Sequence, residues 1–182
     1  MGVNAKMDKF ADSINYTIRL AESDDYTKIK ECFHSGNTVI DNDFATSEFD
    51  RRFVSYVVIN KDNGDIIACY SLGSSACIYS IYDKSYFTPA IEITLFAVDE
   101  RYQDIKTEDG CECLSAIIFY ELLSYISYLT DEVIGATKVI LYATPKAIPF
   151  YTKCGFGAFE NNMLQNQDSF LDGCTPMYID IT

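Results

Sequence analysis

The chain has 182 residues, of which 48% are hydrophobic, and it carries a net charge of −13 at pH 7 from 14 basic and 27 acidic residues. This length can bury one substantial core and is short for two ordinary domains, so we expect an N-terminal extension over residues 1–15 and a single domain over 16–182. No run approaches the ~20 apolar residues of a membrane span, and the start lacks an apolar signal core, which predicts a cytoplasmic protein without membrane contact.

The first half of the chain predicts a strand, two helices and a β-hairpin. Glu22 and Asp24 place carboxylates at the start of the first helix, where the helix dipole favours them. Asn63-Gly64 is a hairpin turn pair between two β-rich runs. In chain order, the predicted elements are a strand at 16–20, a helix from Glu22 to about Phe33, a helix at 43–52, and strands at 53–59 and 66–79.

The second half begins with an aromatic-rich connection over residues 80–89, which ends at Pro89. Residues 90–98 form a nearly continuous apolar run, as in a strand covered on both faces of its sheet. Apolar residues recur at helical spacing over 113–129 and predict a helix that covers one face of the sheet. The tail, 176–181, alternates as a final strand after a polar linking segment at 160–173.

Residues 136–159 read as a strand, a short helix and a second strand. Pro145 fits the first turn of a helix over about 146–154, and Gly155 fits a left-handed cap at its end. On this helix Ala147, Phe150, Tyr151 and Cys154 share one face, so Tyr151 is expected to point into the protein. Taken alone, it would be an ordinary core tyrosine.

Two blocks of the sequence resemble the GNAT superfamily of acyl-CoA-dependent N-acetyltransferases. Residues 147–156, Ala-x-x-Phe-Tyr-x-x-x-Gly-Phe, are similar to the last conserved block of that family. Residues 91–103, IEITLFAVDERYQ, look like its central strand and the approach to its pyrophosphate loop. The blocks stand in the family's order, separated by the long helical segment, and the resemblance covers about residues 16–182.

The resemblance implies an α/β (α+β) fold with a mixed, largely antiparallel central sheet and helices on both faces, in the order β-α-α-β-β-β-α-β-α-β-β. In that fold the central strand and the strand after the long helix splay apart. The pantetheine arm of acetyl-CoA lies in the gap and bonds to free backbone groups like an added strand. The residues that the resemblance places at the cofactor are Phe96, Ala97, Val98, Gln103, Lys106, Thr107, Gly110, Thr144 and Phe150.

The resemblance also implies two catalytic residues. Tyr151 would be the general acid that protonates the departing CoA thiolate. Glu92 would be the general base, as in some members of the superfamily. Its place in an apolar strand should raise its pKa, as a base for an ammonium group requires. An ion pair with an arginine or lysine of the chain is an equally good reading of Glu92.

The loop after Gln103 departs from the family pattern. The usual glycine-rich loop closes its backbone N–H groups on the pyrophosphate, whereas this chain reads Asp-Ile-Lys-Thr-Glu-Asp-Gly-Cys-Glu-Cys over 104–113. Only Gly110 remains as a candidate, with partial compensation from Lys106 and Thr107. Thr144 stands where the family has asparagine. Cofactor binding is therefore expected to be weakened.

Metal and disulfide chemistry are not expected. The seven cysteines form no Cys-x-x-Cys pair and are odd in number, which favours reduced, mostly buried thiols. Cys111 and Cys113 have the wrong spacing for a zinc knuckle, and His34 is the one histidine. His34 also lacks a partner in any recognisable nucleophile motif, which favours a surface or helix-end position.

Three functions remain open. The first is transfer of an acetyl group from acetyl-CoA to a primary amine, on a small cationic molecule or a peptide, by direct attack. The second is a degenerate, non-catalytic GNAT-like interaction module. The third is an aminoacyl-tRNA-acetylating toxin, because residues 65–80 with the 91–103 block resemble that subgroup. The net charge of −13 argues against nucleic acid as a partner, although acidity also serves solubility. The acceptor and the oligomeric state, a homodimer included, stay undetermined.

Overall fold

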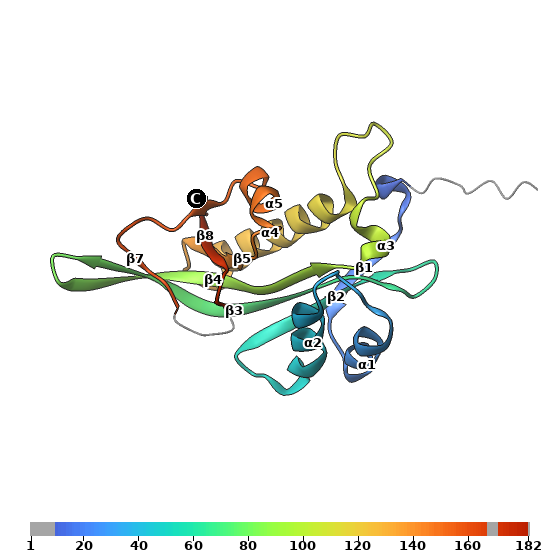
Figure 1. The fold of residues 1–182 in the computed structure, drawn as a ribbon, viewed down its shortest axis with the longest axis horizontal. Coiled ribbons are helices and arrows are strands. Elements are labelled where there is room, and N and C mark those ends of the chain that lie inside the picture. The colour runs from blue at the N-terminus through green and yellow to red at the C-terminus, as the bar shows by residue number, and fades with distance from the viewer. Residues whose placement is uncertain (1–9, 167–170, 182) are drawn as a thin grey trace, which may run out of the picture. The chain divides into compact units, whose positions relative to one another are not determined.

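The computed structural model describes residues 10–166 and 171–181 (Figure 1). The chain divides into two compact units: unit 1 comprises Met1–Glu48, Tyr56–Cys69 and Ala97–Phe119, and unit 2 comprises Phe49–Ser55, Tyr70–Phe96 and Tyr120–Thr182. Residues 1–9 of the expected extension and 167–170 of the expected linking segment lie outside the described residues. The single domain over 16–182 stays a prediction.

The described elements follow the predicted alternation of helices and strands, with a few short additions. In chain order they are η1 (Ala11–Ser13), β1 (Tyr16–Leu20), α1 (Ser23–Cys32), α2 (Thr38–Thr46), η2 (Ser47–Phe49), β2 (Phe53–Asn60), β3 (Ile66–Ile81), β4 (Lys84–Val98), α3 (Glu100–Gln103), α4 (Leu114–Glu132), β5 (Lys138–Ala143), α5 (Ile148–Lys153), β6 (Gly157–Ala158), β7 (Met163–Leu164) and β8 (Thr175–Asp180).

The strands form one sheet in the order β1-β2-β3-β4-β5-β8-β6, and β7 pairs with β3. β1 is antiparallel to β2, and β8 is antiparallel to both β5 and β6. β4 and β5 run parallel, as expected for strands joined through a long helix. The predicted mixed, largely antiparallel sheet is therefore confirmed.

Strand β1 and helix α1 are joined by a partly buried ion pair in unit 1. The side chain of Asp25 is 1% exposed and accepts two hydrogen bonds from the Arg19 guanidinium, at 2.5 and 2.9 Å. It also accepts the N–H of Glu22 and so closes a capping box at the start of α1. Burial alone would raise the pKa of Asp25, but Arg19 and the Glu22 N–H outweigh it and hold the pKa below its usual value.

Replacing Asp25 by alanine is expected to lower the free energy of unfolding at pH 7 by about 2–3 kcal/mol, because the partly buried Arg19 then lacks its partner. Since the folded-state pKa is depressed, this contribution is present above the unfolded pKa of aspartate and is lost as the pH falls through the folded value. Urea unfolding at pH 7 and in acid measures it. Glu31→Ala, an exposed change on the same helix, should stay within about 0.5 kcal/mol. An equal effect for both variants would refute the pair's role.

Helix α2 lies earlier in the chain than predicted. A helix was expected at 43–52, but α2 spans Thr38–Thr46 and is followed by the short η2. The Asn37 side chain caps it by accepting the N–H groups of Val39 and Ile40, at 3.1 and 3.4 Å. The prediction was wrong because this cap, which satisfies the first free N–H groups of the helix, was not recognised in the sequence.

The predicted connection over residues 80–89 is also wrong. In unit 2, β3 continues to Ile81 and β4 begins at Lys84, so the two strands form a long hairpin (Figure 1). Tyr82 and Asp83 make the turn with φ angles of 49° and 60°. Turns of this left-handed kind match the twist of the strands. The residues that usually identify them in a sequence are Asn and Gly, and neither is present at these two positions.

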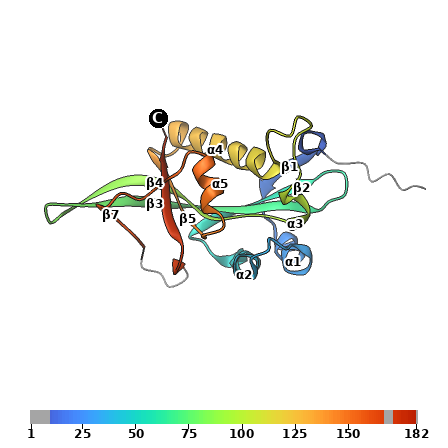
Figure 2. The ribbon, with the colours of Figure 1, turned by 45° about the horizontal axis from the view of Figure 1, so that its top comes forward.

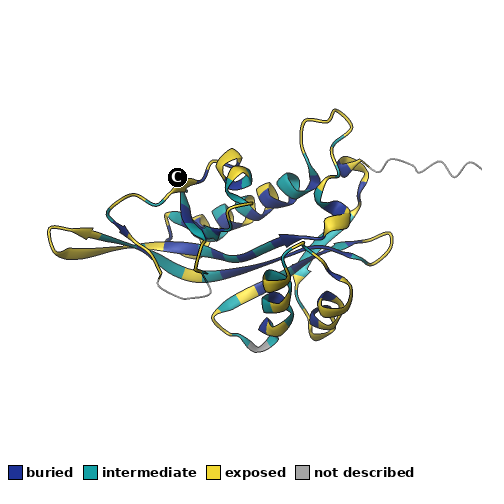
Figure 3. Ribbon diagram, in the orientation of Figure 1, coloured by how far each residue is buried: buried dark blue, intermediate teal, exposed yellow. Residues whose placement is uncertain are grey.

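Helix α4 confirms the long helix predicted from apolar spacing. Leu114, Ile118, Leu122 and Ile126 repeat every four residues and are fully buried. The buried positions are dark blue in Figure 3, along α4 and the central strands. None of the helices among the described residues is both long and apolar enough to span a bilayer.

Candidate active site

Strands β4 and β5 separate partway along their length, within unit 2. Their parallel pairing runs from Ala90 opposite Lys138 to Ile93 opposite Leu141. Both strands continue beyond this point, and β5 stays paired with β8 as far as Ala143. On the described residues, the edge of β4 that faces β5 therefore has no strand partner after Ile93. This open backbone is the feature that strand-like binding of an extended ligand requires.

Helix α5 follows β5 after a turn and is shorter than predicted. It spans Ile148–Lys153, and Pro149, not Pro145, occupies its first turn. Gly155 has φ +94°. Its N–H bonds to the Thr152 carbonyl, and the Phe156 N–H bonds to the Tyr151 carbonyl, at 3.1 and 3.0 Å. These two bonds form a Schellman motif, so the predicted left-handed glycine cap is confirmed.

Tyr151 lies at the centre of an aromatic cluster in unit 2. Its ring packs edge-on against Phe150, at 5.3 Å between centroids, and against Phe156, at 6.0 Å. The Phe150 ring in turn stacks on Phe96 of β4, at 6.2 Å and 11° between planes. Two predicted cofactor residues, Phe96 and Phe150, are thus brought together beside the open part of β4.

The hydroxyl of Tyr151 is held in its protonated form. The side chain is 8% exposed, which confirms that it points into the protein. Burial, with a smaller contribution from Cys154, raises the pKa of Tyr151 well above its usual value. A buried phenol of this kind stays neutral in the resting protein and can donate a hydrogen bond.

Glu92 lies on β4 opposite Ile140, one residue before the strands separate. Burial raises the pKa of its carboxyl, and a hydrogen bond from Ser75 opposes the shift in part. The expected raised pKa is therefore found. Among the described residues Glu92 has no ion pair with an arginine or lysine, which the alternative reading of this residue requires.

Tyr142 lies within the electrostatic range of Glu92, and it was not among the residues predicted for the site. It follows Ile140 by two positions on β5 and so lies on the face of the sheet that carries Glu92. Burial raises the pKa of Tyr142, and the charge of Glu92 adds to the effect. The Asn166 N–H donates to its hydroxyl at 3.0 Å. Strand alternation from Glu92 and Ile140 was the pattern that could have identified it.

In unit 1, Gln103 holds the end of β4. Its side-chain amide donates to the Val98 carbonyl at 2.7 Å and to the Ser35 carbonyl at 2.9 Å. The side chains of Ala97 and Val98 are buried, so only their backbone groups could meet a ligand. Gln103 therefore orders the backbone that the resemblance assigns to pantetheine, and part of the hydrogen-bonding capacity of the Val98 carbonyl is already used.

The 104–113 loop of unit 1 is closed on itself. Lys106 and Cys113 form an antiparallel bridge. The Thr107 N–H bonds to the Glu112 carbonyl, and the Gly110 N–H bonds to the Thr107 carbonyl, both at 2.9 Å. A glycine-rich phosphate loop keeps such N–H groups free for the ligand. The N–H groups of Thr107 and Gly110 are therefore not free to bind a phosphate in this form of the loop.

Asp109 stabilises the closed form of this loop. Its carboxylate accepts the Thr107 hydroxyl at 2.5 Å and the Cys111 N–H at 3.0 Å. These bonds hold the pKa of Asp109 below its usual value. At the start of α4, the Leu114 N–H donates to the Ile105 carbonyl at 2.8 Å, which removes one donor from the helix terminus.

Thr144 follows β5 directly and begins the turn into α5. Its carbonyl accepts the N–H groups of Ala147 and Ile148, at 2.9 and 3.2 Å. The structure gives it this backbone role, and its expected side-chain role at the cofactor stays a prediction.

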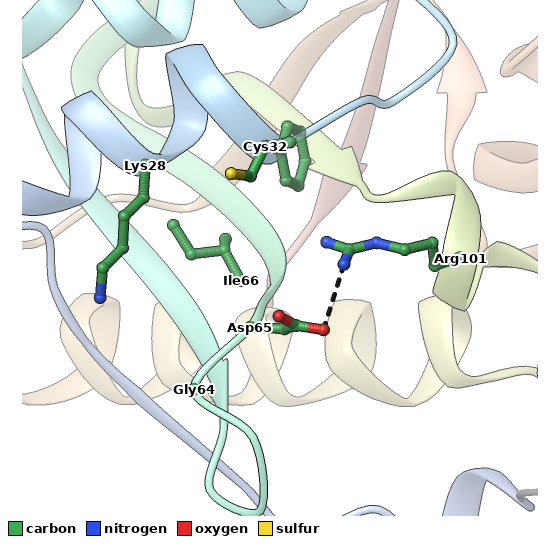
Figure 4. Close-up of a pocket in the computed structure, with 7 residues that line it drawn as sticks. Lys28, Cys32, Gly64, Asp65, Ile66 and Arg101 are labelled. Carbon is green, nitrogen blue, oxygen red and sulfur yellow. Dashed lines mark hydrogen bonds and ion pairs between the residues drawn. The ribbon is translucent and has the colours of Figure 1, made fainter.

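A separate pocket of about 220 Å³ lies in unit 1 (Figure 4). None of the predicted site residues lines it. Arg101, at its edge, is held by Asp65 at 3.1 Å and by Asp99 at 2.8 Å, so its charge is already matched. The residues that line it are Lys28, Cys32, Phe33, Gly64, Asp65, Ile66 and Arg101.

The remaining candidate groups are dispersed. The seven cysteines lie within the described residues and form no disulfide, and Cys69, Cys77 and Cys154 are the buried ones. Within the described residues no three His, Cys, Asp or Glu side chains are grouped as metal ligands would be. The backbone of His34 bonds to Asp99 and Glu100 in unit 1.

No family model and no curated protein match the sequence. Solved structures do match its fold. A bacterial toxin shares 18% identity at a TM-score of 0.70, with 92% of each chain covered. A mutant of the toxin AtaT, bound to the C-terminus of the antitoxin AtaR and acetyl-CoA, shares 16% at 0.65, with 91% of this chain and 93% of that chain covered. AtaT complexed with acetyl-methionyl-tRNAfMet shares 15% at 0.63, with 91% and 95% covered.

At these identities the likeness establishes the fold. The chain has the GNAT fold, as the two sequence blocks predicted. Acetyl-CoA and acetyl-methionyl-tRNA are bound in the structures of AtaT. Because AtaT has this fold and forms a complex with a tRNA, net charge alone is not a sufficient ground for excluding nucleic acid as a partner.

Proposed function

We propose that this protein is an acyl-CoA-dependent N-acyltransferase that transfers an acetyl group from acetyl-CoA to a primary amine. The observation that carries the proposal is the separation of β4 and β5 after Ile93, with the half-buried carboxyl of Glu92 beside the point of separation. A closed sheet would leave neither backbone groups nor space for an extended thioester. The fold shared with an acetyl-CoA complex of AtaT supports the same reading.

The residues of unit 2 fit the donor better than the loop of unit 1 does. The open edge of β4 up to Phe96 fits a strand-like pantetheine arm, whereas the closed 104–113 loop offers few free N–H groups to a pyrophosphate. When bound, acetyl-CoA supplies the activated acetyl thioester. Backbone groups of Phe96, Ala97 and Val98 would hold it.

Two side chains of unit 2 then act as general base and general acid. Glu92 accepts a proton from the ammonium form of the acceptor, which frees the nitrogen lone pair for direct attack. Tyr151 donates its hydroxyl hydrogen toward the departing sulfur. Ser75 keeps the Glu92 carboxylate oriented, and Tyr142 lies near enough for the Glu92 charge to raise its pKa.

The acceptor is a primary amine, and two classes compete. The net charge of −13 favours a small cationic amine or a peptide amine. The α-amine of an aminoacyl-tRNA is also primary, and the AtaT complex with acetyl-methionyl-tRNA favours that class. Transfer of a radiolabelled acetyl group distinguishes the two classes of acceptor. Spermidine, a lysine peptide and bulk aminoacyl-tRNA are tested in parallel as acceptors. We expect transfer to the small or peptide amines at moderate salt, and label on tRNA alone would select the toxin-like function.

Acetyl-CoA is expected to bind weakly but measurably, because the pantetheine contacts are backbone contacts while the pyrophosphate loop is closed. Calorimetry with acetyl-CoA, compared with 3′-dephospho-CoA and with acetylpantetheine, tests this. Acetylpantetheine should retain most of the affinity if the open edge of β4 is the main contact. Neither heat nor a thermal shift at millimolar acetyl-CoA would favour the alternative, a non-catalytic interaction module.

Replacing Asp109 by asparagine is expected to tighten acetyl-CoA binding about two- to fivefold, because a negative charge near the phosphates is removed while the side chain can still accept hydrogen bonds. Asp62→Asn, in the exposed turn after β2, is the matched control and should leave the dissociation constant within twofold. Calorimetry at low and moderate salt measures both, and the effect of Asp109 should shrink as salt increases. An unchanged affinity would place the pyrophosphate away from this loop.

A further inference from the structure

The C-terminal end of α4, in unit 2, exposes apolar side chains. Tyr125, Tyr128, Val133 and Ile134 are 36, 57, 64 and 46% exposed. Asp131 and Glu132 lie among them and are exposed as well. We call these six residues the α4 end surface. Tyr125, Tyr128 and Glu132 follow one another at three- and four-residue spacing and so lie on one side of the helix.

The sequence around this surface carries acidic residues and no basic ones. From Thr107 to Thr137 the sequence contains no lysine, arginine or histidine. The last turn of α4 has no basic residue, although the C-terminus of a helix carries a partial negative charge that favours one. Asp131 and Glu132 add to that charge. The acidic residues of this stretch are Glu108, Asp109, Glu112, Glu121, Asp131 and Glu132.

Apolar exposure and negative charge at one place indicate a binding surface. Exposed apolar patches mark interaction sites. Carboxylates at a helix C-terminus are repelled by the partial negative charge there and so lower stability, and a bound cation would offset this repulsion. Phosphate groups would be repelled here, and so would a second copy of a chain with a net charge of −13. The complementary ligand is cationic and partly apolar.

We propose that the α4 end surface binds an arginine-rich, amphipathic peptide segment of a partner protein. Guanidinium groups suit both the tyrosines and the carboxylates of the surface, because they stack on tyrosine rings and form bidentate hydrogen bonds with carboxylates. Val133 and Ile134 provide contacts for aliphatic side chains of the same segment. Lysine offers neither the planar stacking nor the bidentate bond, so arginine peptides should bind more tightly than lysine peptides.

The test uses a fluorescein-labelled 16-residue peptide with arginine and leucine at helical spacing, and a second peptide with lysine in place of arginine. Fluorescence anisotropy at 0.15 M salt measures binding to the full chain. We expect the arginine peptide to bind about threefold or more tightly than the lysine peptide. The double variant Asp131→Lys with Glu132→Lys should weaken it at least about tenfold, and Tyr128→Ser about three- to tenfold.

The charge control reverses two exposed acids of unit 1, Glu31→Lys with Asp62→Lys, and changes the net charge by the same amount. It should bind the arginine peptide within about twofold of the wild type. The Asp131 and Glu132 variant should also melt about 1–3 °C higher than the wild type, because lysines at a helix C-terminus are favourable. Weaker binding with higher stability excludes unfolding as the cause.

Several results would overturn the proposal. Equal weakening by both double variants would mean that only total charge matters. Equal binding by all variants would place the peptide elsewhere. Binding of a uridine 16-mer that is lost with Tyr128→Ser would make this a nucleic-acid surface. Self-association of the wild type that the same variant abolishes would make it a contact between copies. These measurements need no acetyl transfer, so they fail or succeed independently of the proposed activity.

Discussion

Glu92→Gln is expected to lower kcat/KM for the amine acceptor by about 10²–10⁴-fold while leaving acetyl-CoA affinity nearly unchanged. Glutamine keeps the size of the side chain and can still accept the Ser75 hydroxyl, but it cannot take up a proton. Steady-state kinetics of acetyl transfer, with calorimetry of acetyl-CoA binding, separate the two effects. The loss should be largest between the pKa of Glu92 and that of the acceptor, where the carboxylate is ionised and the amine is still protonated, and it should shrink in acid, where Glu92 is itself protonated.

The pH profile identifies the group. Burial raises the pKa of Glu92, so the acidic limb of kcat/KM should lie above the usual range of a glutamate and disappear in Glu92→Gln. Ser75→Ala removes a hydrogen bond that lowers this pKa, so it should move the limb to still higher pH without abolishing it. An unchanged profile in both variants would assign Glu92 a structural role and leave proton removal to a water relay.

Stability gives a second measure of the same carboxyl. A glutamate with a raised folded-state pKa stabilises the protein least where it is ionised, so its contribution falls as the pH rises through the folded value. Glu92→Gln should therefore be at least as stable as the wild type at neutral pH, and its advantage should shrink in acid. A group that lowers stability and raises activity is typical of a functional site.

Regular patterns predicted the parts of the fold that local chemistry determines. Helix α4 and the left-handed cap at Gly155 could be predicted without tertiary information. The periodicity of apolar residues predicts the helix, and the absence of a side chain lets glycine adopt a positive φ. The turn at Tyr82-Asp83 could not be predicted in this way. Its left-handed backbone is imposed by the pairing of β3 with β4 and not by the turn residues themselves.

The candidate site was predictable in its strands and not in its loop. The nearly continuous apolar run of residues 90–98 placed Glu92 in an apolar strand, from which a raised pKa was expected. The closing of the 104–113 loop depends on a network in which Asp109 accepts both a hydroxyl and a backbone N–H. No sequence pattern specifies that network. In the sequence, Gly110 alone remained of the family's glycines, which indicated weak pyrophosphate binding. The geometry adds that the N–H groups of Thr107 and Gly110 already bond to carbonyls of the loop.

Tyr151→Phe should lower kcat by roughly 10²-fold, toward the small end of general-acid effects. Burial raises the pKa of Tyr151 well above that of a thiol, so complete transfer of its proton to a thiolate is uphill. The hydroxyl therefore assists the departing sulfur mainly as a hydrogen-bond donor. A thiolate can also leave unaided at neutral pH, which limits the loss.

The matched control is Tyr178→Phe, which removes a hydroxyl bonded to the exposed Glu160 and should leave kcat unchanged. Tyr151→Phe keeps the ring contacts with Phe150 and Phe156, so the free energy of unfolding should stay within about 1 kcal/mol of the wild type. Rapid-quench measurement of acetyl transfer, with urea unfolding, determines both. Wild-type turnover in Tyr151→Phe would make Tyr151 a packing residue of its aromatic cluster. The fold would be unaffected by that outcome, since it rests on the pairing of β4, β5 and β8.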